Sequence, residues 1–471
     1  MLKIQKILGK FKAGFATIKL INLALWKIKK LGFEGLLWYS IHPIIDGELW
    51  YKKAENLEIL ESKYFSAVGK NKPNRSLAAQ INKLWHKAEI LEFTGAFQQA
   101  QRIKKEILHT TWEKHNLQVG KFVPPFIDSF WLEAFGHQGF LGVFSLAQSL
   151  NIIHPERRTI IDLGHANLKR PVMSEILKDF NLWQNNSNAS ILNHPNLFCL
   201  SEKITMVASP QGFLHISEVT EKTLTLARDI SLDIKFSLSE EHKDAARSYL
   251  CKLGLPRDAW FVGLHVREGW RMKERNADIN TYLEAIKFIT SQGGWVVRIG
   301  DSSMTPLHGV KNVIELFQAT DEYLVMQDFV MTNCKFFIGT TSGPQIFPPI
   351  FGVPLLSANI VAVAKNNFSC QAPSIAIPKV WVEMTSNREL SIEESLELGL
   401  GFVEISNAQQ GKYRTRNNTS DEILSATKEI YSLSNQKDMV MSTRQNSLLV
   451  LRKEIGAITY GPFAESFLQN N

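Results

Sequence analysis

The stretch that most constrains this chain is residues 261–286, which read FVGLHVREGWRMKERNADINTYLEAI. Its apolar beginning, 261–266, predicts a buried strand. A helix is expected from about Asp278, whose carboxylate suits an N-cap. His265 and Arg267 are two positions apart at the strand end, so their side chains can point the same way. Because open α/β sheets bind ligands at the carboxyl ends of their strands, this pair predicts an anion site.

Strands and helices continue to alternate after this stretch. Further apolar strands are expected at 295–300, 312–316, 335–339 and 354–359. Helices are expected at 278–291, 321–333, 344–351 and 420–431, the last with Ser420 as N-cap. A loop is expected near 378–390, and the tail 436–471 has no clear pattern. The alternation predicts a parallel doubly wound sheet in residues 246–435, which we call the second lobe.

A weaker version of the same pattern precedes it in residues 121–245, which we call the first lobe. The piece IDSFWLEAFGHQGFLGVFSLAQSL predicts a strand, a Gly-containing turn at 136–139 and a helix, an arrangement that presents backbone N–H groups to an anion. Strands at 159–163, 197–200 and 204–208 and a helix at 171–180 follow, and the boundary between the lobes is placed in the charged helical segment 237–259. These elements predict a first Rossmann-like lobe.

The amino-terminal residues are helical and basic. Residues 1–30 hold eight lysines and no acid, interleaved with apolar residues. They predict a basic amphipathic helix that lies peripherally on an anionic membrane surface. The alternative is a helix docked on the protein with its lysines in solvent. Lys19 interrupts the apolar part and argues against a transmembrane span.

A second helical region, residues 31–120, follows without any strand signal. Within it Ala88, Gly95, Phe97 and Ala100 have the spacing of a tetratricopeptide hairpin. A single copy of the repeat is better explained by a plain helical hairpin, because repeat arrays need about three units for stability.

Charge and cysteine content limit the classes of partner. The net charge of +7 favours anionic partners such as phosphates, acidic glycans and membrane surfaces. Nucleic acid is not expected as a partner, because the lysines cluster at the amino terminus without a nucleic-acid module. The four scattered cysteines fit a reducing, cytoplasmic compartment. With no D-x-D or H-E-x-x-H pattern in the sequence, we expect neither a metal nor a cofactor.

Four clusters of polar residues fall at the predicted carboxyl ends of second-lobe strands. They are His265-x-Arg267, Arg298 to Asp301, Gly339-Thr340-Thr341-Ser342-Gly343 and Asn359. The guanidinium of Arg267 matches a phosphate bidentately, and the hydroxyl-rich turn suits an anion nest. Each has a structural alternative: Arg267 paired with an acid, His265 as a core histidine, the hydroxyls as a helix cap, Asp301 as a turn residue and Arg298 as a buried, paired charge.

Two longer stretches, which together contain all four clusters, carry a resemblance to a known family. HVREGW…RNADINTYLEAIKFITSQGGWVVRIGDSS and CKFFIGTTSGPQIFPPIFGVPLLSAN resemble a family of bacterial glycosyltransferases that is distantly similar to GT-B fucosyltransferases. The match covers roughly residues 255–385. It implies two Rossmann-like lobes facing a cleft, with an α-helical region before them.

The resemblance also implies roles for individual residues. Arg267 would contact the diphosphate of a GDP-sugar, Thr341 and Ser342 would contact phosphate, and Asp301 would correspond to an acid after the middle strand. Arg275 and Asn276 fit the pattern of the bacterial family, and these relatives need no metal. Two departures stand out. Glu268 replaces the second Arg of the fucosyltransferases, and Asp328 is about one position away from their helix aspartate.

The sequence therefore predicts a metal-independent glycosyltransferase of the hexosyl or deoxyhexosyl type. It would transfer a sugar from a nucleotide-sugar donor to a bacterial surface glycan or glycolipid. His265, Arg267 and the hydroxyl turn would stabilise the departing diphosphate, and His137 would be the base. The alternative is a non-catalytic nucleotide- or carbohydrate-binding protein whose helical region binds a partner.

Overall fold

The computed structural model describes residues 91, 99–103, 105–106, 126–127, 135–153, 160–162, 170–183, 206–209, 212–232, 236–269, 272–318, 320–370, 372–402, 411–435 and 441–471. All of them belong to one unit, Lys72–Asn471. The predicted membrane helix at 1–30 and most of the helical region 31–120 lie outside the described residues. Within that region, 99–103 are helical and Ala100 is buried. None of the described helices is long and apolar enough to cross a membrane.

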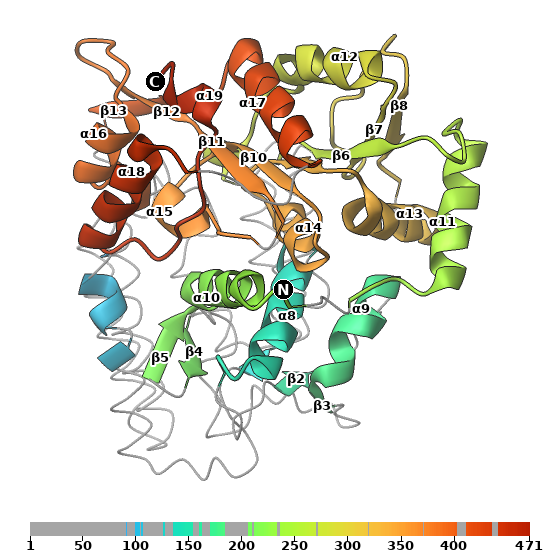
Figure 1. Cartoon of the computed structure of the whole chain (residues 1–471), viewed down its shortest axis with the longest axis horizontal. Helices are drawn as coiled ribbons and strands as arrows, with labels where there is room; N and C mark the ends of the chain where they lie inside the picture. Colours follow the sequence, from blue (N-terminus) through green and yellow to red (C-terminus); the bar gives the residue numbers. More distant parts are fainter. Residues whose placement is uncertain are drawn as a thin grey trace, which may run out of the picture. The chain divides into compact units, whose positions relative to one another are not determined.

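The second lobe is built on a six-stranded sheet whose order is β11-β10-β9-β6-β7-β8 (Figure 1). Its strands are β6 Phe261–His265, β7 Trp295–Ile299, β8 Val313–Leu316, β9 Phe337–Gly339, β10 Leu355–Ile360 and β11 Ser374–Pro378. All neighbouring pairs are parallel. The prediction of an α/β fold with a parallel doubly wound sheet is therefore confirmed.

Successive residues of these strands point into two different cores. Phe261, Val297 and Phe337 pack into one core. Their neighbours Val262, Val296 and Ile338 pack into the other. Buried side chains on both faces explain why the strands read as continuous apolar runs.

Helices cover both faces of the sheet. On one face α12, Leu283–Ser291, lies beside α17, Ser420–Leu433 (Figure 1). On the other face α13, Asp321–Asn333, packs on β6, β7 and β8. The predicted bounds of α13 are confirmed. Asp278 is confirmed as an N-cap, since it accepts a hydrogen bond from the Asn280 N–H at 2.9 Å. It caps the 3₁₀ turn η4, Ile279–Tyr282, that precedes α12.

Two expectations for helices of the second lobe were wrong in detail. The helix expected at 344–351 is a 3₁₀ turn, η5 Gly343–Ile346, followed by the short helix α14 Phe347–Ile350. Prolines within this stretch cannot donate the hydrogen bonds of a longer α-helix. The N-cap of α17 is Thr419, not Ser420, because Thr419 and Glu422 form a reciprocal capping box.

The loop expected near 378–390 contains a strand. Residues Val380–Glu383 form β12, which pairs antiparallel with β13, Tyr413–Arg416. The unpatterned segment 436–471 forms α18, Thr443–Glu454, and α19, Glu465–Leu468. Phe463 and Phe467 from this segment are buried in the core beside α17. Apolar residues near the carboxyl terminus thus complete the second lobe.

The first lobe contains a smaller parallel sheet among its described residues. Its order is β1 Phe126–Ile127, β2 Ile160–Asp162 and β3 Asn181–Trp183. The helices α8 Phe135–Ser149, α9 Pro171–Ile176 and α10 Ile216–Asp229 belong to the same lobe, whereas α11 Glu240–Lys252 packs against α13 of the second lobe. The strand expected at 204–208 is β4, Met206–Ser209. It pairs antiparallel with β5, Gly212–His215, instead of joining the parallel sheet.

The two lobes share one apolar core. Leu141 and Phe144 on α8 belong to the same buried cluster as Phe347 and Ile350 on α14. A Cβ atom on Gly139 would lie 3.1 Å from the Ile346 Cβ, so the glycine face of α8 allows close helix packing.

Candidate active site

The sheet order places four carboxyl strand ends side by side. In the order β10-β9-β6-β7, these ends carry Asn359, the turn 340–342, His265 and Asp301. The register of β6 and β9 confirms that the two central strand ends are neighbours, because His265 lies opposite Gly339. The predicted clusters therefore lie along one edge of one sheet, where parallel α/β sheets bind ligands.

His265 lies at the centre of this edge and is 5% exposed. Its Nδ1 lies 3.1 Å from the Ile299 carbonyl oxygen, and its Nε2 lies 3.1 Å from the Ser342 Oγ. A carbonyl only accepts, so Nδ1 carries the proton and Nε2 accepts from the Ser342 hydroxyl. Burial lowers the pKa of His265 to about 4, with the positive charge of Arg267 acting in the same direction. The imidazole is therefore neutral at pH 7.

The three hydroxyls of the Gly-Thr-Thr-Ser-Gly turn contact the ends of two neighbouring strands, β6 and β10. The Thr340 Oγ1 accepts from the Arg267 N–H at 3.1 Å, just after β6. The Thr341 Oγ1 accepts from the Val361 N–H at 3.0 Å, just after β10. Ser342 donates to His265. The turn thus ties neighbouring strand ends together, and the η5 helix after it is too short to act as an anion-binding dipole.

Arg267 follows β6 and is partly exposed. Its carbonyl accepts a hydrogen bond from the Ala277 N–H at 3.1 Å. Its guanidinium lies against Gly269, since a Cβ built on Gly269 would be 2.7 Å from the Arg267 Nη2. The guanidinium fork is therefore held at the same sheet edge as His265.

Asn276, which the sequence assigned to donor binding, contacts the backbone of Gly269. Its Oδ1 accepts from the Gly269 N–H at 2.9 Å, and its Nδ2 donates to the Gly269 carbonyl at 2.7 Å. Arg275, in the same predicted group, closes the 3₁₀ turn η3, Lys273–Arg275. The structure thus gives Asn276 a defined contact, and the donor-binding role of Arg275 stays a prediction.

Asp301 and Glu268 shape the loop after β7. Asp301 accepts from the backbone and the hydroxyl of Ser303, at 2.8 and 2.5 Å, so it forms an Asx turn. Glu268 accepts from the Thr305 N–H at 2.5 Å. Glu268, which departs from the fucosyltransferase pattern, therefore connects this loop to the end of β6 through a hydrogen bond.

Arg298 is 1% exposed inside β7. Its Nη1 forms an ion pair with Glu315 on β8 and donates to the Thr305 carbonyl at 3.0 Å. Burial lowers its pKa, and the Glu315 carboxylate opposes that shift. These contacts favour the structural alternative for Arg298, namely a buried, paired charge. Its hydrogen bond to Thr305 also fixes the loop after β7.

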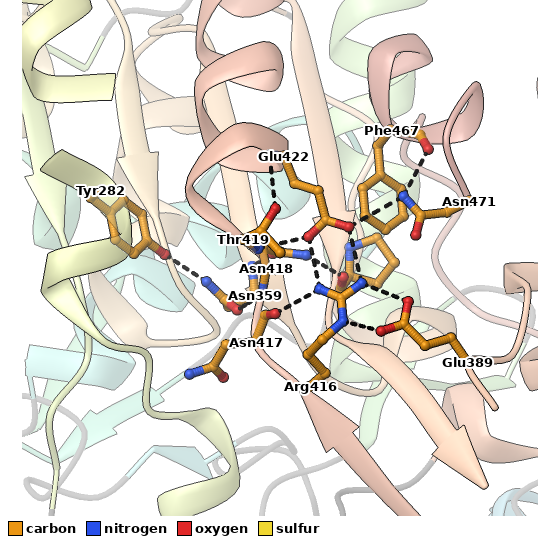
Figure 2. Close-up of polar contacts among 11 residues, drawn as sticks. Tyr282, Asn359, Glu389, Arg416, Asn417, Asn418, Thr419, Glu422, Phe467 and Asn471 are labelled. Atoms are coloured by element: carbon orange, nitrogen blue, oxygen red, sulfur yellow. Dashed lines mark hydrogen bonds and ion pairs between the residues drawn. The ribbon is translucent and has the colours of Figure 1, made fainter. Parts of the chain in front are cut away.

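Asn359 is fully buried and has a φ of 53°, in the left-handed region that asparagine tolerates. Figure 2 shows its reciprocal pair with Asn418, in which each backbone N–H donates to the other side-chain oxygen at 2.7 Å. Its Nδ2 donates to the Tyr282 hydroxyl at 2.9 Å. Asn359 therefore joins the end of β10 to the segment before α17.

His137, the proposed base, lies on α8. The sequence placed Gly136-His137-Gln138-Gly139 in a turn, but the structure places all four residues inside the helix, because α8 begins at Phe135. Gln138 and Gly139 are buried. The His137 side chain lies outside the described part of the structure, so its role as a base stays a prediction.

Sequence reasoning missed Lys379, a lysine that directly follows β11 and is 6% exposed. Its Nζ donates to the Asn276 carbonyl at 2.6 Å, and burial lowers its pKa to about 8. No sequence pattern pointed to Lys379, because the strand that precedes it, β11, was not predicted. Among the described residues, no three His, Cys, Asp or Glu side chains are grouped to hold a metal.

No protein-family model matches this chain, and no curated protein matches it. Several solved structures are similar to it. A glycosyl transferase family 9 protein from Veillonella parvula has 11% identity and a TM-score of 0.36, over 65% of this chain and 96% of that chain. E. coli ADP-heptose lipopolysaccharide heptosyltransferase II has 13% identity and a TM-score of 0.39, over 67% and 99%.

A third similar structure is UDP-GlcNAc 2-epimerase from Methanocaldococcus jannaschii. It has 10% identity and a TM-score of 0.22, over 63% of this chain and 82% of that chain. Identities and TM-scores this low assign neither a substrate nor a reaction to this chain. The functional argument therefore rests on its own residues.

Proposed function

We propose that this protein is a glycosyltransferase that binds the diphosphate of a nucleotide-sugar at the carboxyl ends of β6, β7 and β9. The observation that carries the proposal is the position of Arg267 on this edge, beside the hydrogen-bonded pair of His265 and Ser342. A guanidinium fork matches two phosphate oxygens at once, and parallel sheets bind ligands at this edge.

The reaction would be a direct displacement at the anomeric carbon. The acceptor oxygen forms the new bond while the nucleoside diphosphate leaves, and Arg267 stabilises the negative charge that develops on it. His265 is neutral at pH 7, so its contribution is to orient Ser342 and not to supply charge. The acceptor proton would pass to a base from the first lobe, for which His137 is our candidate.

The donor is proposed as a nucleotide-sugar, with a GDP-sugar among the candidates, and the acceptor as a bacterial surface glycan or glycolipid. The proposed reaction uses no metal, because Arg267 supplies the positive charge at the diphosphate. Residues 1–30 would hold the enzyme on the inner face of the cytoplasmic membrane. Flotation on anionic liposomes tests this last part, and equal flotation of the chain lacking residues 1–30 would refute it.

Calorimetric titration with ADP, GDP and UDP, and with the matching monophosphates, tests the diphosphate site. We expect one diphosphate to bind, and Arg267→Ala to weaken its Kd about 10- to 100-fold, because hydrogen bonds to charged groups contribute about 1.5–3 kcal/mol. Arg388→Ala is the matched control, since Arg388 is exposed and paired with Glu394. Unchanged binding in Arg267→Ala would refute the site.

The second candidate function, a non-catalytic nucleotide-binding protein, uses the same edge. The extensive contacts of the hydroxyl turn within the protein are its best support, because they explain the motif without chemistry. Incubation with nucleotide-sugars, followed by mass spectrometry of released nucleoside diphosphate, separates the two. Donor hydrolysis or transfer that depends on Arg267 supports the enzyme, and tight binding without release supports the binding protein.

A further inference from the structure

The loop between β6 and η4 is closed by hydrogen bonds that end next to Arg267. The Arg267 carbonyl accepts from the Ala277 N–H at 3.1 Å. The side-chain amide of Asn276 contacts both the N–H and the carbonyl of Gly269, which lies two residues after Arg267. A primary amide can accept and donate at once, whereas a carboxylate lacks the donor and an apolar side chain lacks both groups.

Gly269 leaves the space in which the Arg267 guanidinium lies. A Cβ on Gly269 would be 2.7 Å from the Arg267 Nη2, 2.9 Å from Cζ and 3.2 Å from Nη1. Gly269 has no left-handed φ, so the requirement is for space and not for an unusual backbone conformation. Any side chain at this position would push the guanidinium away.

Asn276 is itself fixed from a second strand. The buried Lys379, which follows β11, donates to the Asn276 carbonyl at 2.6 Å. Asp278, two residues later, caps η4, so the chain that follows Asn276 is also anchored. Contacts therefore run from the end of β11 through Asn276 and Gly269 to the guanidinium.

We propose that Asn276 is a positioning residue for Arg267, because it holds the Gly269 backbone against which the guanidinium lies. This inference rests on the proposed function, in which Arg267 binds the diphosphate. In this proposal Asn276 does not contact the donor directly, and it affects diphosphate binding through Arg267. Loss of a purely structural residue would change ligand affinity with or without Arg267. Loss of Asn276 changes ligand affinity only while Arg267 is present.

Two variants perturb this arrangement in different ways. Gly269→Ala inserts a methyl group into the place of the guanidinium, and a flexible side chain can move away without unfolding the protein. Asn276→Asp keeps the acceptor for the Gly269 N–H but loses the donor to its carbonyl. Asn333→Asp is the matched control, because the exposed Asn333 lies at the end of α13 and the charge change is the same.

The test measures the Kd of the nucleoside diphosphate for each variant, alone and combined with Arg267→Ala, together with the melting temperature. We expect Gly269→Ala and Asn276→Asp to weaken binding about tenfold, or about 1.4 kcal/mol, and to have no further effect when Arg267 is already alanine. The melting temperature of Gly269→Ala should stay close to that of the parent.

An unchanged Kd in Gly269→Ala, or an equal loss with and without Arg267, would overturn the positioning role. If Asn276→Asp does not fold, an unchanged Kd in Gly269→Ala still overturns the proposal. Failure of the proposed function gives a different result, namely that Arg267→Ala alone binds the diphosphate as well as the parent does.

Discussion

Protonation of His265 should destabilise the protein in mild acid. The ring is buried, its Nδ1 is held by the Ile299 carbonyl, and its pKa is lowered from 6.5 to about 4. Arg267 and Arg298 oppose a positive charge on it, whereas Asp301 favours one. Folding therefore disfavours the protonated ring.

The sign and size of the effect follow from proton binding. Above pH 6.5 the ring is neutral in both the folded and the unfolded chain, so it adds no pH dependence. Between pH 6.5 and 4 the unfolded chain binds the proton and the folded protein does not, so the free energy of unfolding falls as pH falls. At about 1.4 kcal/mol for each pH unit, the total loss is about 3 kcal/mol.

Urea denaturation of the parent and of His265→Asn at intervals from pH 8 to pH 4.5 measures this loss. Asparagine retains an N–H for the Ile299 carbonyl and does not titrate. The free energy of unfolding of the parent should therefore fall more steeply below pH 6.5 than that of the variant. His308→Asn, at an exposed position, should follow the parent. Parallel curves for the parent and His265→Asn would refute the buried, neutral ring.

Two other predictions concern contacts between the lobes. Burial raises the pKa of Glu221 from 4.5 to about 7, so its folded form binds the proton more tightly. The free energy of unfolding should fall by about 3 kcal/mol as pH rises from 4.5 to 7, and a melting-temperature series should show that Glu221→Gln lacks this slope. Arg170 pairs with the fully buried Asp328 at 2.5 Å. Chemical denaturation should show that Asp328→Ala lowers the free energy of unfolding by about 3–5 kcal/mol. The double change Arg170→Met with Asp328→Leu should recover most of this loss. An equal loss in the single and the double variant would contradict the prediction.

The buried pair between Arg170 and Asp328 also bears on the fucosyltransferase comparison. The resemblance aligned Asp328 loosely with an aspartate of that family. In the structure its two oxygens accept from the Arg170 Nη1 and from the Val172 N–H, at 2.5 and 3.1 Å. Burial raises its pKa and Arg170 opposes this. Asp328 therefore joins the lobes, and the comparison carries less weight at this position than at His265 and Arg267.

The sequence by itself determined the order of the second-lobe elements from β6 to β10. Runs of apolar residues marked β6, β7, β9 and β10, because strands buried on both faces need continuous apolar sequence. Position at or just after the end of such a strand then placed His265 and Arg267 at the carboxyl edge of the sheet. The first lobe was harder to read. Short strands such as β3 and β5 depend on pairing with distant partners, which one sequence does not reveal.

Only the tertiary structure decided what each polar group contacts. Thr340 and Thr341 read as phosphate ligands, yet their hydroxyls accept from backbone groups after β6 and β10. The proton position on His265 is set by a carbonyl of another strand. Partners 20 to 73 residues apart in the sequence determine these roles. Residue type and spacing can therefore locate a site, but hydrogen-bonding groups are satisfied only by the groups that folding brings near them.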